Sequence, residues 1–316
     1  METKKITALV FILPFVLLAL VFGSLVFRTP QVKADTASSS ASVTNVVPVA
    51  SIVSVDTAAA SVTLTENTTT TVTVTATVTD NNGCEDIDSV SVKFYKTTTG
   101  AEAADDENNH YTVTASEDGG SCTAGGSDLT ATFTATIPVY YYADPTDITS
   151  VDSPTDWTAL VTPSDEASGT TDTDTIEMDT LTALDVTAAI AYGELALGAD
   201  TGTGDDTTTV TNTGNEGIDV DVDGYGASDG DGYSMTCTWG TIPVANEKYA
   251  TAASTAYASK TALSDTATEV DMDIAQRTTT VTTGDLYWGF GMPTDGVGGS
   301  CTGTVVFTAN SDSTLD

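Results

Sequence analysis

The chain has 316 residues, with 45 acidic and 9 basic side chains and a formal net charge of −36 at pH 7. Such a charge repels the phosphates of nucleic acids and of anionic lipids, which excludes nucleic-acid binding, and it attracts cations instead. Thr and Val are frequent after residue 34, and no amphipathic helical pattern is found there. The composition therefore predicts an all-β protein, long enough for two domains.

Residues 1–34 have the pattern of an export signal. A basic pair, Lys4 and Lys5, precedes a charge-free apolar run at residues 6–27, and Val-Lys-Ala, ending at Ala34, suits a signal peptidase. We therefore expect a cleaved signal peptide and an extracellular or cell-surface location. The run of 22 residues is also long enough to cross a bilayer as a helix, so an uncleaved membrane anchor is the alternative.

Residues 35–60 are expected to be a flexible segment that contains a strand. Their first part is rich in Ser and Ala, whereas residues 46–55 are apolar enough to form a strand, which Pro48 confines to a sheet edge. One interpretation is an edge strand of the protein's own first sheet. The alternative is a strand donated to a second copy of the chain, because sheet edges are templates for pairing.

Residues 61–162 predict a β-sandwich. Short runs there alternate apolar and polar side chains with a period of two, and turns rich in Gly, Asp and Asn separate them. The segments VTDNNGCEDIDSVSVKFY (78–95) and DWTALVTPSDEASG (156–169) resemble immunoglobulin-like (Ig-like) modules of secreted bacterial and archaeal surface proteins. This resemblance implies an Ig-like sandwich. Residues 163–180 are polar and acidic, and we expect them to be a linker between two domains.

Residues 181–316 predict a second β-sandwich. The turn Asn-Thr-Gly-Asn at residues 212–215 lies between a Thr-rich strand and an alternating strand. This pattern resembles repeats of S-layer-like cell-surface proteins and, more distantly, biofilm-fibre subunits of the camelysin/TasA type. The resemblance implies a second sandwich used for surface structure or assembly, and it transfers no catalytic residues.

Four cysteines in an exported chain indicate two disulfides. Four cysteines allow three pairings, and spacing does not decide among them. One bridge in each domain, Cys84 with Cys122 and Cys237 with Cys301, is the simplest arrangement. Cys237 and Cys301 each share a strand face with apolar neighbours, which predicts a bridge between two sheets of the second domain.

Two acidic loops carry the oxygen ligands that Ca²⁺ prefers, and Ca²⁺ is the one cofactor that we expect. Asp and Asn beside Gly are also ordinary turn residues, so turn formation is the competing interpretation. The candidate ligands are Asp80, Asn82, Glu85, Asp86 and Asp88 in the first loop and Asp229 and Asp231 in the second.

Three tyrosines and the one histidine are further candidates for site residues. Tyr140, Tyr141 and Tyr142 follow one another on a predicted strand, so at least one ring is expected in solvent, where it offers a partner or sugar a stacking surface. The single histidine, His110, lies in an Asp- and Asn-rich stretch and is expected to be solvated. No nucleophile motif or phosphate loop accompanies it, and we expect no enzyme.

Together these features predict an exported structural or adhesive protein on the surface of a prokaryote. Its partners would be other surface proteins, glycans or copies of itself, with membrane contact only through residues 6–27 if the leader is not cleaved. One alternative is a self-assembling extracellular fibre subunit that donates residues 43–55 to its neighbour. Another is a calcium-dependent carbohydrate-binding module that uses the acidic loops and Tyr140–Tyr142.

Overall fold

The computed structural model describes residues 35–123, 125, 127–187 and 189–311. These residues form β-strands joined by loops, with three 3-10 turns, η1 (Cys84–Asp86), η2 (Val244–Asn246) and η3 (Tyr257–Ser259). The all-β expectation is therefore confirmed. The expected leader or anchor at residues 1–34 lies outside the described residues, and within the described part no helix is long and apolar enough to span a bilayer.

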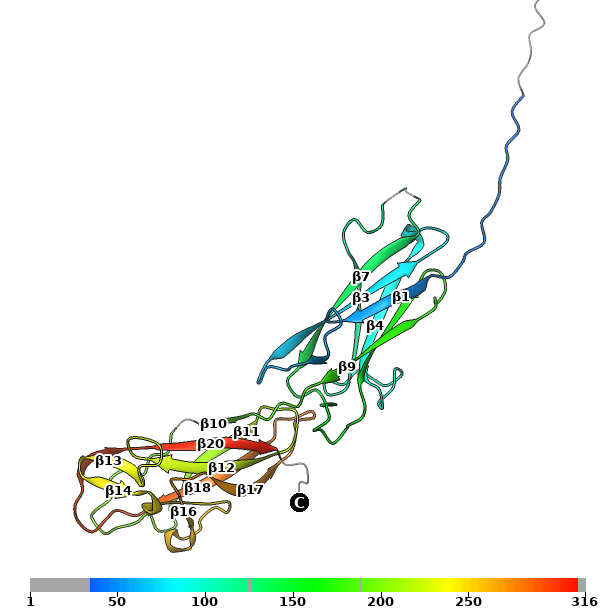
Figure 1. The fold of residues 1–316 in the computed structure, drawn as a ribbon. Coiled ribbons are helices and arrows are strands. Elements are labelled where there is room, and N and C mark those ends of the chain that lie inside the picture. Colours follow the sequence, from blue (N-terminus) through cyan, green and yellow to red (C-terminus); the bar gives the residue numbers. More distant parts are fainter. Residues whose placement is uncertain (1–34, 124, 126, 188, 312–316) are drawn as a thin grey trace, which may run out of the picture. The chain divides into compact units, whose positions relative to one another are not determined.

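The strands between residues 49 and 178 form two sheets, which we call the N-terminal sheet pair (Figure 1). One sheet has the order β1-β3-β7-β6 and the other β2-β9-β8-β4-β5. The strands are β1 (Val49–Val55), β2 (Ser61–Val62), β3 (Thr69–Thr79), β4 (Ser89–Lys96), β5 (His110–Thr114), β6 (Ser116–Glu117), β7 (Thr130–Tyr140), β8 (Trp157–Ser164) and β9 (Asp172–Met178).

Strands β3 and β7 show how the sequence produces these sheets. Val72 and Val74 of β3 are almost fully buried, whereas the Thr residues between them point away from the core. These outward residues stand directly opposite Thr residues of β7, as in Thr73 with Thr136 and Thr75 with Thr134. β-Branched side chains fit this pleated surface, and direct Thr–Thr pairs across strands stabilise it further.

Both sheets of the N-terminal pair pack on one hydrophobic core. Trp157 of β8 is fully buried, and its ring centroid lies 4.9 Å from that of Phe94 on β4. Its indole N–H donates to the Asp144 carbonyl at 2.9 Å, so the polar atom of this large side chain is satisfied. Apolar residues of β3 and β7 complete the same cluster.

Two segments near the edges of this sheet pair bear on the expected domain boundaries. β1 pairs antiparallel with β3 at the edge of its own sheet, so residues 49–55 form an edge strand. Residues 163–180, expected to be a linker, contain the end of β8 and all of β9, whose Ile176 and Met178 are buried in the core. The sequence did not predict β9 because only these two of its seven side chains are apolar.

The strands after residue 183 form three further sheets, which we call the C-terminal sheet group. The sheet orders are β10-β11-β18-β15-β16, β17-β12-β20 and β14-β13-β19. The strands are β10 (Leu184–Val186), β11 (Asp206–Asn212), β12 (Ile218–Tyr225), β13 (Tyr233–Trp239), β14 (Thr241–Pro243), β15 (Glu247–Ala250), β16 (Thr261–Ala262), β17 (Thr268–Ile274), β18 (Thr283–Phe290), β19 (Gly298–Thr302) and β20 (Thr304–Ser311).

The C-terminal sheet group has two hydrophobic clusters. The larger surrounds Trp288, whose indole N–H donates to the Thr208 hydroxyl at 2.8 Å. The smaller contains Ile242, Phe290 and the disulfide-bonded Cys237. Because the apolar side chains are divided between two clusters, this region is packed around two centres.

Both disulfides have the expected pairing, Cys84–Cys122 and Cys237–Cys301. The second bridge differs from the expectation in its position. Cys237 on β13 stands directly opposite Cys301 on β19, with Cα atoms 3.9 Å apart, so the bridge joins neighbouring strands of one sheet and not two sheets. Residue parity along a strand gives the face to which a side chain points, but not the sheet that the strand joins.

Candidate functional site

Three carboxylates from distant segments meet at one end of the N-terminal sheet pair. We call Asp80, Asp86 and Asp165 the acidic cluster. Asp80 directly follows β3, Asp86 is the last residue of η1, and Asp165 directly follows β8. Each offers one carboxylate oxygen, and these oxygens lie within 4.8 Å of one another. Of the two such acidic groups in the described part of the chain, this one contains buried carboxylates.

The hydrogen bonds of the acidic cluster involve only uncharged donors. Asp80 is fully buried, and its Oδ1 accepts the Asn82 N–H at 2.7 Å. Its Oδ2 is also buried and has no hydrogen-bond partner among the described residues. Asp165 is 8 % exposed and accepts from the Ala167 N–H at 2.6 Å and from the Asn45 side-chain amide at 3.0 Å. Repulsion among the three carboxylates is therefore not offset by a hydrogen-bonded cation.

The structure places only part of the first predicted ligand set in this cluster. Asp80 and Asp86 belong to it. Glu85 accepts the Gly125 N–H at 2.8 Å, and Asn82 Oδ1 accepts the Val46 N–H at 2.7 Å. Asp88 does not join the cluster. Sequence reasoning missed Asp165 because it was assigned to the linker; the turn that follows β8 was the signal that could have found it.

The second predicted loop shows turn chemistry. Asp231 is half-buried, and its carboxylate accepts hydrogen bonds from four backbone N–H groups. These bonds hold its pKa at about 2. Asp229 belongs to no acidic group of the described residues that could hold an ion. The four donors are Ala227, Tyr233, Gly226 and Ser228. Stabilisation of the turn by these hydrogen bonds therefore explains why an Asp is present at position 231.

Backbone hydrogen bonds explain a further acidic group, which consists of Asp219, Asp271 and Asp273. Asp219 Oδ1 accepts the N–H groups of Met272 at 2.9 Å and Asp273 at 3.2 Å. These bonds lie where the register between β12 and β17 shifts. Asp271 and Asp273 are exposed, so this carboxylate group stabilises an irregular strand pair at the surface.

Two of the three consecutive tyrosines are buried, whereas Tyr140 is half-buried. Tyr141 is 4 % and Tyr142 is 1 % exposed, which corrects the expectation of a stacking surface at these positions. The Arg277 guanidinium lies 4.3 Å from the ring centroid of Tyr142 and donates to the Tyr141 hydroxyl at 3.2 Å. The alternation rule failed because β7 ends at Tyr140, so the next two rings do not follow the strand period.

Two side-chain amides bind backbone carbonyls of the residues that directly follow β7 and of segments elsewhere in the chain. Asn108 donates to the carbonyls of Tyr142 at 2.9 Å and Arg277 at 2.8 Å. Asn215 donates to the carbonyls of Ala143 and Asp179, both at 3.0 Å. These amides satisfy buried carbonyls that strand pairing leaves free.

The single histidine is buried, contrary to expectation. His110 is 1 % exposed at the start of β5, and its ring stacks on Tyr95. Nδ1 lies 2.9 Å from Asp105 Oδ1, and Nε2 lies 3.3 Å from the Ala101 carbonyl. Both ring nitrogens thus have partners that fix the ring in place, and neither is paired with a hydroxyl or thiol nucleophile.

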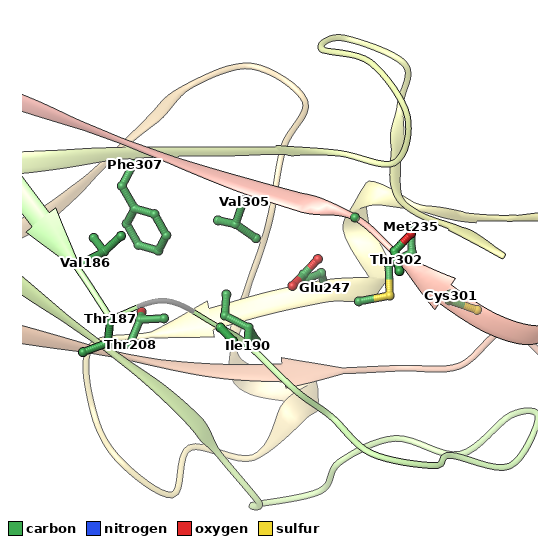
Figure 2. Close-up of a pocket in the computed structure, with 12 residues that line it drawn as sticks. Val186, Thr187, Ile190, Thr208, Met235, Glu247, Cys301, Thr302, Val305 and Phe307 are labelled. Carbon is green, nitrogen blue, oxygen red and sulfur yellow. The ribbon is translucent and has the colours of Figure 1, made fainter.

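One buried acid that was not among the predicted site residues lines a cavity. Glu247 is 3 % exposed and lines a cavity of about 370 Å³ with Val305, Phe307 and Met235 (Figure 2). Desolvation raises the pKa of Glu247 to about 7, and the hydrogen bond from the Tyr192 hydroxyl at 2.7 Å opposes this shift. Its inward position was detectable, because Glu247 has the same strand parity as buried Tyr249.

No protein-family model and no curated protein matches this chain. Among solved structures, the secreted serine protease VesC from Vibrio cholerae is similar over 80 % of this chain and 49 % of that protein, with 9 % identity and a TM-score of 0.19. The chain thus spans about half the length of that protein. A likeness at this level carries no argument about fold or activity.

Proposed function

We propose that this protein is an exported structural component of a prokaryotic cell surface, built from two Ig-like β-sandwiches in tandem. It works by holding its shape and by adhesive contact with surface proteins or glycans, and it has no catalytic activity. Two disulfides support the location outside the cytoplasm, because such bonds persist in oxidising compartments. The N-terminal export pattern supports the same location.

The observation that carries this proposal is the use of the cationic side chains. All five basic residues beyond residue 34 have specific structural contacts. Lys260, for example, is 4 % exposed, and its ammonium group donates to Asp205 at 2.7 Å and to the Tyr287 carbonyl at 2.8 Å. The others are Lys93 with Glu102, Lys96 with Asp144 and Asp152, Lys248 over the ring of Tyr257, and Arg277 over the ring of Tyr142.

This use of positive charge leaves an acidic surface. Lysine, arginine and histidine side chains commonly activate nucleophiles or stabilise anions in enzymes. Here these side chains make ion pairs, hydrogen bonds or ring contacts within the fold. The acids in excess face water, where they favour hydration and keep the protein in solution. Such chemistry suits a shape-holding surface protein better than an enzyme.

Assembly through the N-terminal strand is a second candidate, which a separate observation favours. Val46, Val47, Val49 and Ile52 are large apolar side chains left exposed along residues 45–55, with Ile52 76 % exposed. Apolar groups on an edge strand are typical of a surface that pairs with another chain. Under this candidate, the edge at β1 is the contact between copies in an extracellular fibre.

Cell-surface labelling with a genetic deletion tests the first candidate. Intact cells of the source organism should lose the protein to an added protease, and a deletion strain should adhere less or have a weaker envelope. Protection from protease in intact cells would contradict the proposal. An Ile52→Lys variant separates the two candidates, because fibre assembly should fail while surface display of the folded protein persists.

A further inference from the structure

We propose that Asp80, Asp86 and Asp165 bind one divalent cation of the calcium type, and that this ion fastens the segment leading into β1 to the N-terminal sheet pair. This inference goes beyond the proposed function, because it assigns a ligand and a place for it. Four observations lead to it.

The first observation is the convergence of charge. Three carboxylate oxygens within 4.8 Å of one another come from positions separated by up to 85 residues of chain. Folding brings these like charges together at one end of the sheets, where their mutual repulsion opposes the fold. A divalent cation among them converts this repulsion into attraction. No ammonium or guanidinium group of the described residues forms an ion pair with these carboxylates.

The second observation is the oxygen of Asp80 that has no hydrogen-bond partner. Asp80 is fully buried, and its Oδ1 is held by the Asn82 N–H. Its Oδ2 is also buried and lacks a hydrogen-bond partner among the described residues. Leaving a buried carboxylate oxygen without a partner is costly, so native proteins supply a donor or a metal ion. The unpartnered oxygen therefore points independently to a ligand at the acidic cluster.

The third observation concerns the kind of ion. The ligands are all carboxylate oxygens, which hard cations prefer. Ca²⁺ takes six to eight oxygens in flexible geometry and accepts water for those that protein does not supply, which suits a cluster with one exposed member, Asp86. Zn²⁺ prefers sulfur and nitrogen, and the neighbouring Cys84 is committed to its disulfide. The chemistry therefore favours Ca²⁺.

The fourth observation gives the ion a structural effect. The segment before β1 bonds to both loops that carry the ligands. Asn45 donates to Asp165 at 3.0 Å, and the Val46 N–H donates to Asn82 at 2.7 Å. The Pro48 carbonyl accepts the Thr170 N–H at 2.9 Å. A Cβ at Gly169 would lie 2.2 Å from the Pro48 carbonyl oxygen, which shows how closely this segment packs. An ion that draws the two loops together thus holds the segment that enters β1.

Calorimetric titration of the full-length chain, stripped with a chelator and kept in mild detergent, tests the site. CaCl₂ is the probe, and MgCl₂ tests ion preference. We expect one strong Ca²⁺ site, at least tenfold weaker in Asp80→Asn and Asp165→Asn. Because a buried substitution can impair folding, Asp86→Asn is the decisive variant: Asp86 is exposed, and its loss should weaken binding while the far-UV spectrum stays unchanged.

Two matched controls remove one carboxylate each from another acidic region. Asp229→Asn and Asp219→Asn should bind Ca²⁺ at the strong site as the parent chain does. Hydrogen exchange then measures the structural effect, and Ca²⁺ should slow exchange of the Val46 and Ala50 amides at least tenfold. Undiminished binding in Asp86→Asn, binding lost only in Asp219→Asn, or unchanged exchange at Val46 would each overturn the proposal.

Discussion

The two sheet regions use similar strands but place their acids differently. In the N-terminal sheet pair, one apolar core lies between two sheets, and the buried acids Asp80 and Asp165 lie at the ends of strands. In the C-terminal sheet group, Glu247 lies within the protein, against a cavity and between two smaller clusters. The comparison shows that similar alternating strands can pack around one core or around two clusters with a buried acid beside a cavity.

Truncating one buried phenylalanine in each region should give the largest difference. Phe94→Ala removes a ring from the continuous core, and the free energy of unfolding should fall by about 5 kcal/mol. Phe290 is equally buried but lines a cavity beside Tyr192 and Met292, so Phe290→Ala should cost about 3 kcal/mol. Chemical denaturation of both variants measures this. Equal losses would contradict the difference in packing.

Removing each disulfide tests whether the bridges stabilise the regions to similar extents. Replacing Cys84 and Cys122 by Ser opens a 38-residue connection, and replacing Cys237 and Cys301 opens a 64-residue one. Each loss should cost about 2–4 kcal/mol, slightly more for the longer connection, because the unfolded chain gains freedom. Thermal melts of the two double variants compare them. A larger shift for the Cys84 and Cys122 variant would reverse the predicted order.

Replacing Glu247 by Gln should remove a pH-dependent loss of folding stability that the buried carboxyl group causes. Burial raises the pKa of Glu247 from 4.5 to about 7, so the folded state holds a proton that the unfolded state releases between these values. The stability that this proton contributes is complete below pH 4.5 and is lost as the pH rises through 7. Above pH 7, Glu247→Gln should therefore be more stable than the parent by on the order of 2–3 kcal/mol.

The control for this variant is its pH profile. Near pH 4, where Glu247 is protonated in both states, the variant and the parent should unfold at similar denaturant concentrations. The Gln side chain can still accept the hydrogen bond from Tyr192, so loss of that contact does not confound the comparison. A difference between variant and parent that stays constant from pH 4 to pH 8 would show that Glu247 does not titrate as described.

The sequence was sufficient for features that depend on near neighbours. The strict alternation of β3 and β7 predicts strands with one buried face, and the structure has them. The even cysteine count and the simplest pairing were also confirmed. β9 was not predicted because its first four residues are Asp and Thr, which are typical of linkers as well as of strands with little apolar content.

The candidate site could be predicted only in half, because it depends on contacts between distant segments. Asp80 and Asp86 lie six residues apart and were found from their loop composition, whereas Asp165 arrives through the pairing of β4 with β8. The burial of Tyr141 and Tyr142 likewise depends on Arg277, more than 130 residues away. Neither contact has a local sequence signal, since both arise from the packing of separate strands and loops.

A non-reducing peptide map of protein released by protease from intact cells tests the central claim most directly. The account of an exported, disulfide-bonded surface protein predicts that the released fraction contains linked peptides for Cys84–Cys122 and for Cys237–Cys301. Protein that resists the protease until the cells are broken, and that carries four free thiols, would contradict it, because it would place the chain in a reducing compartment.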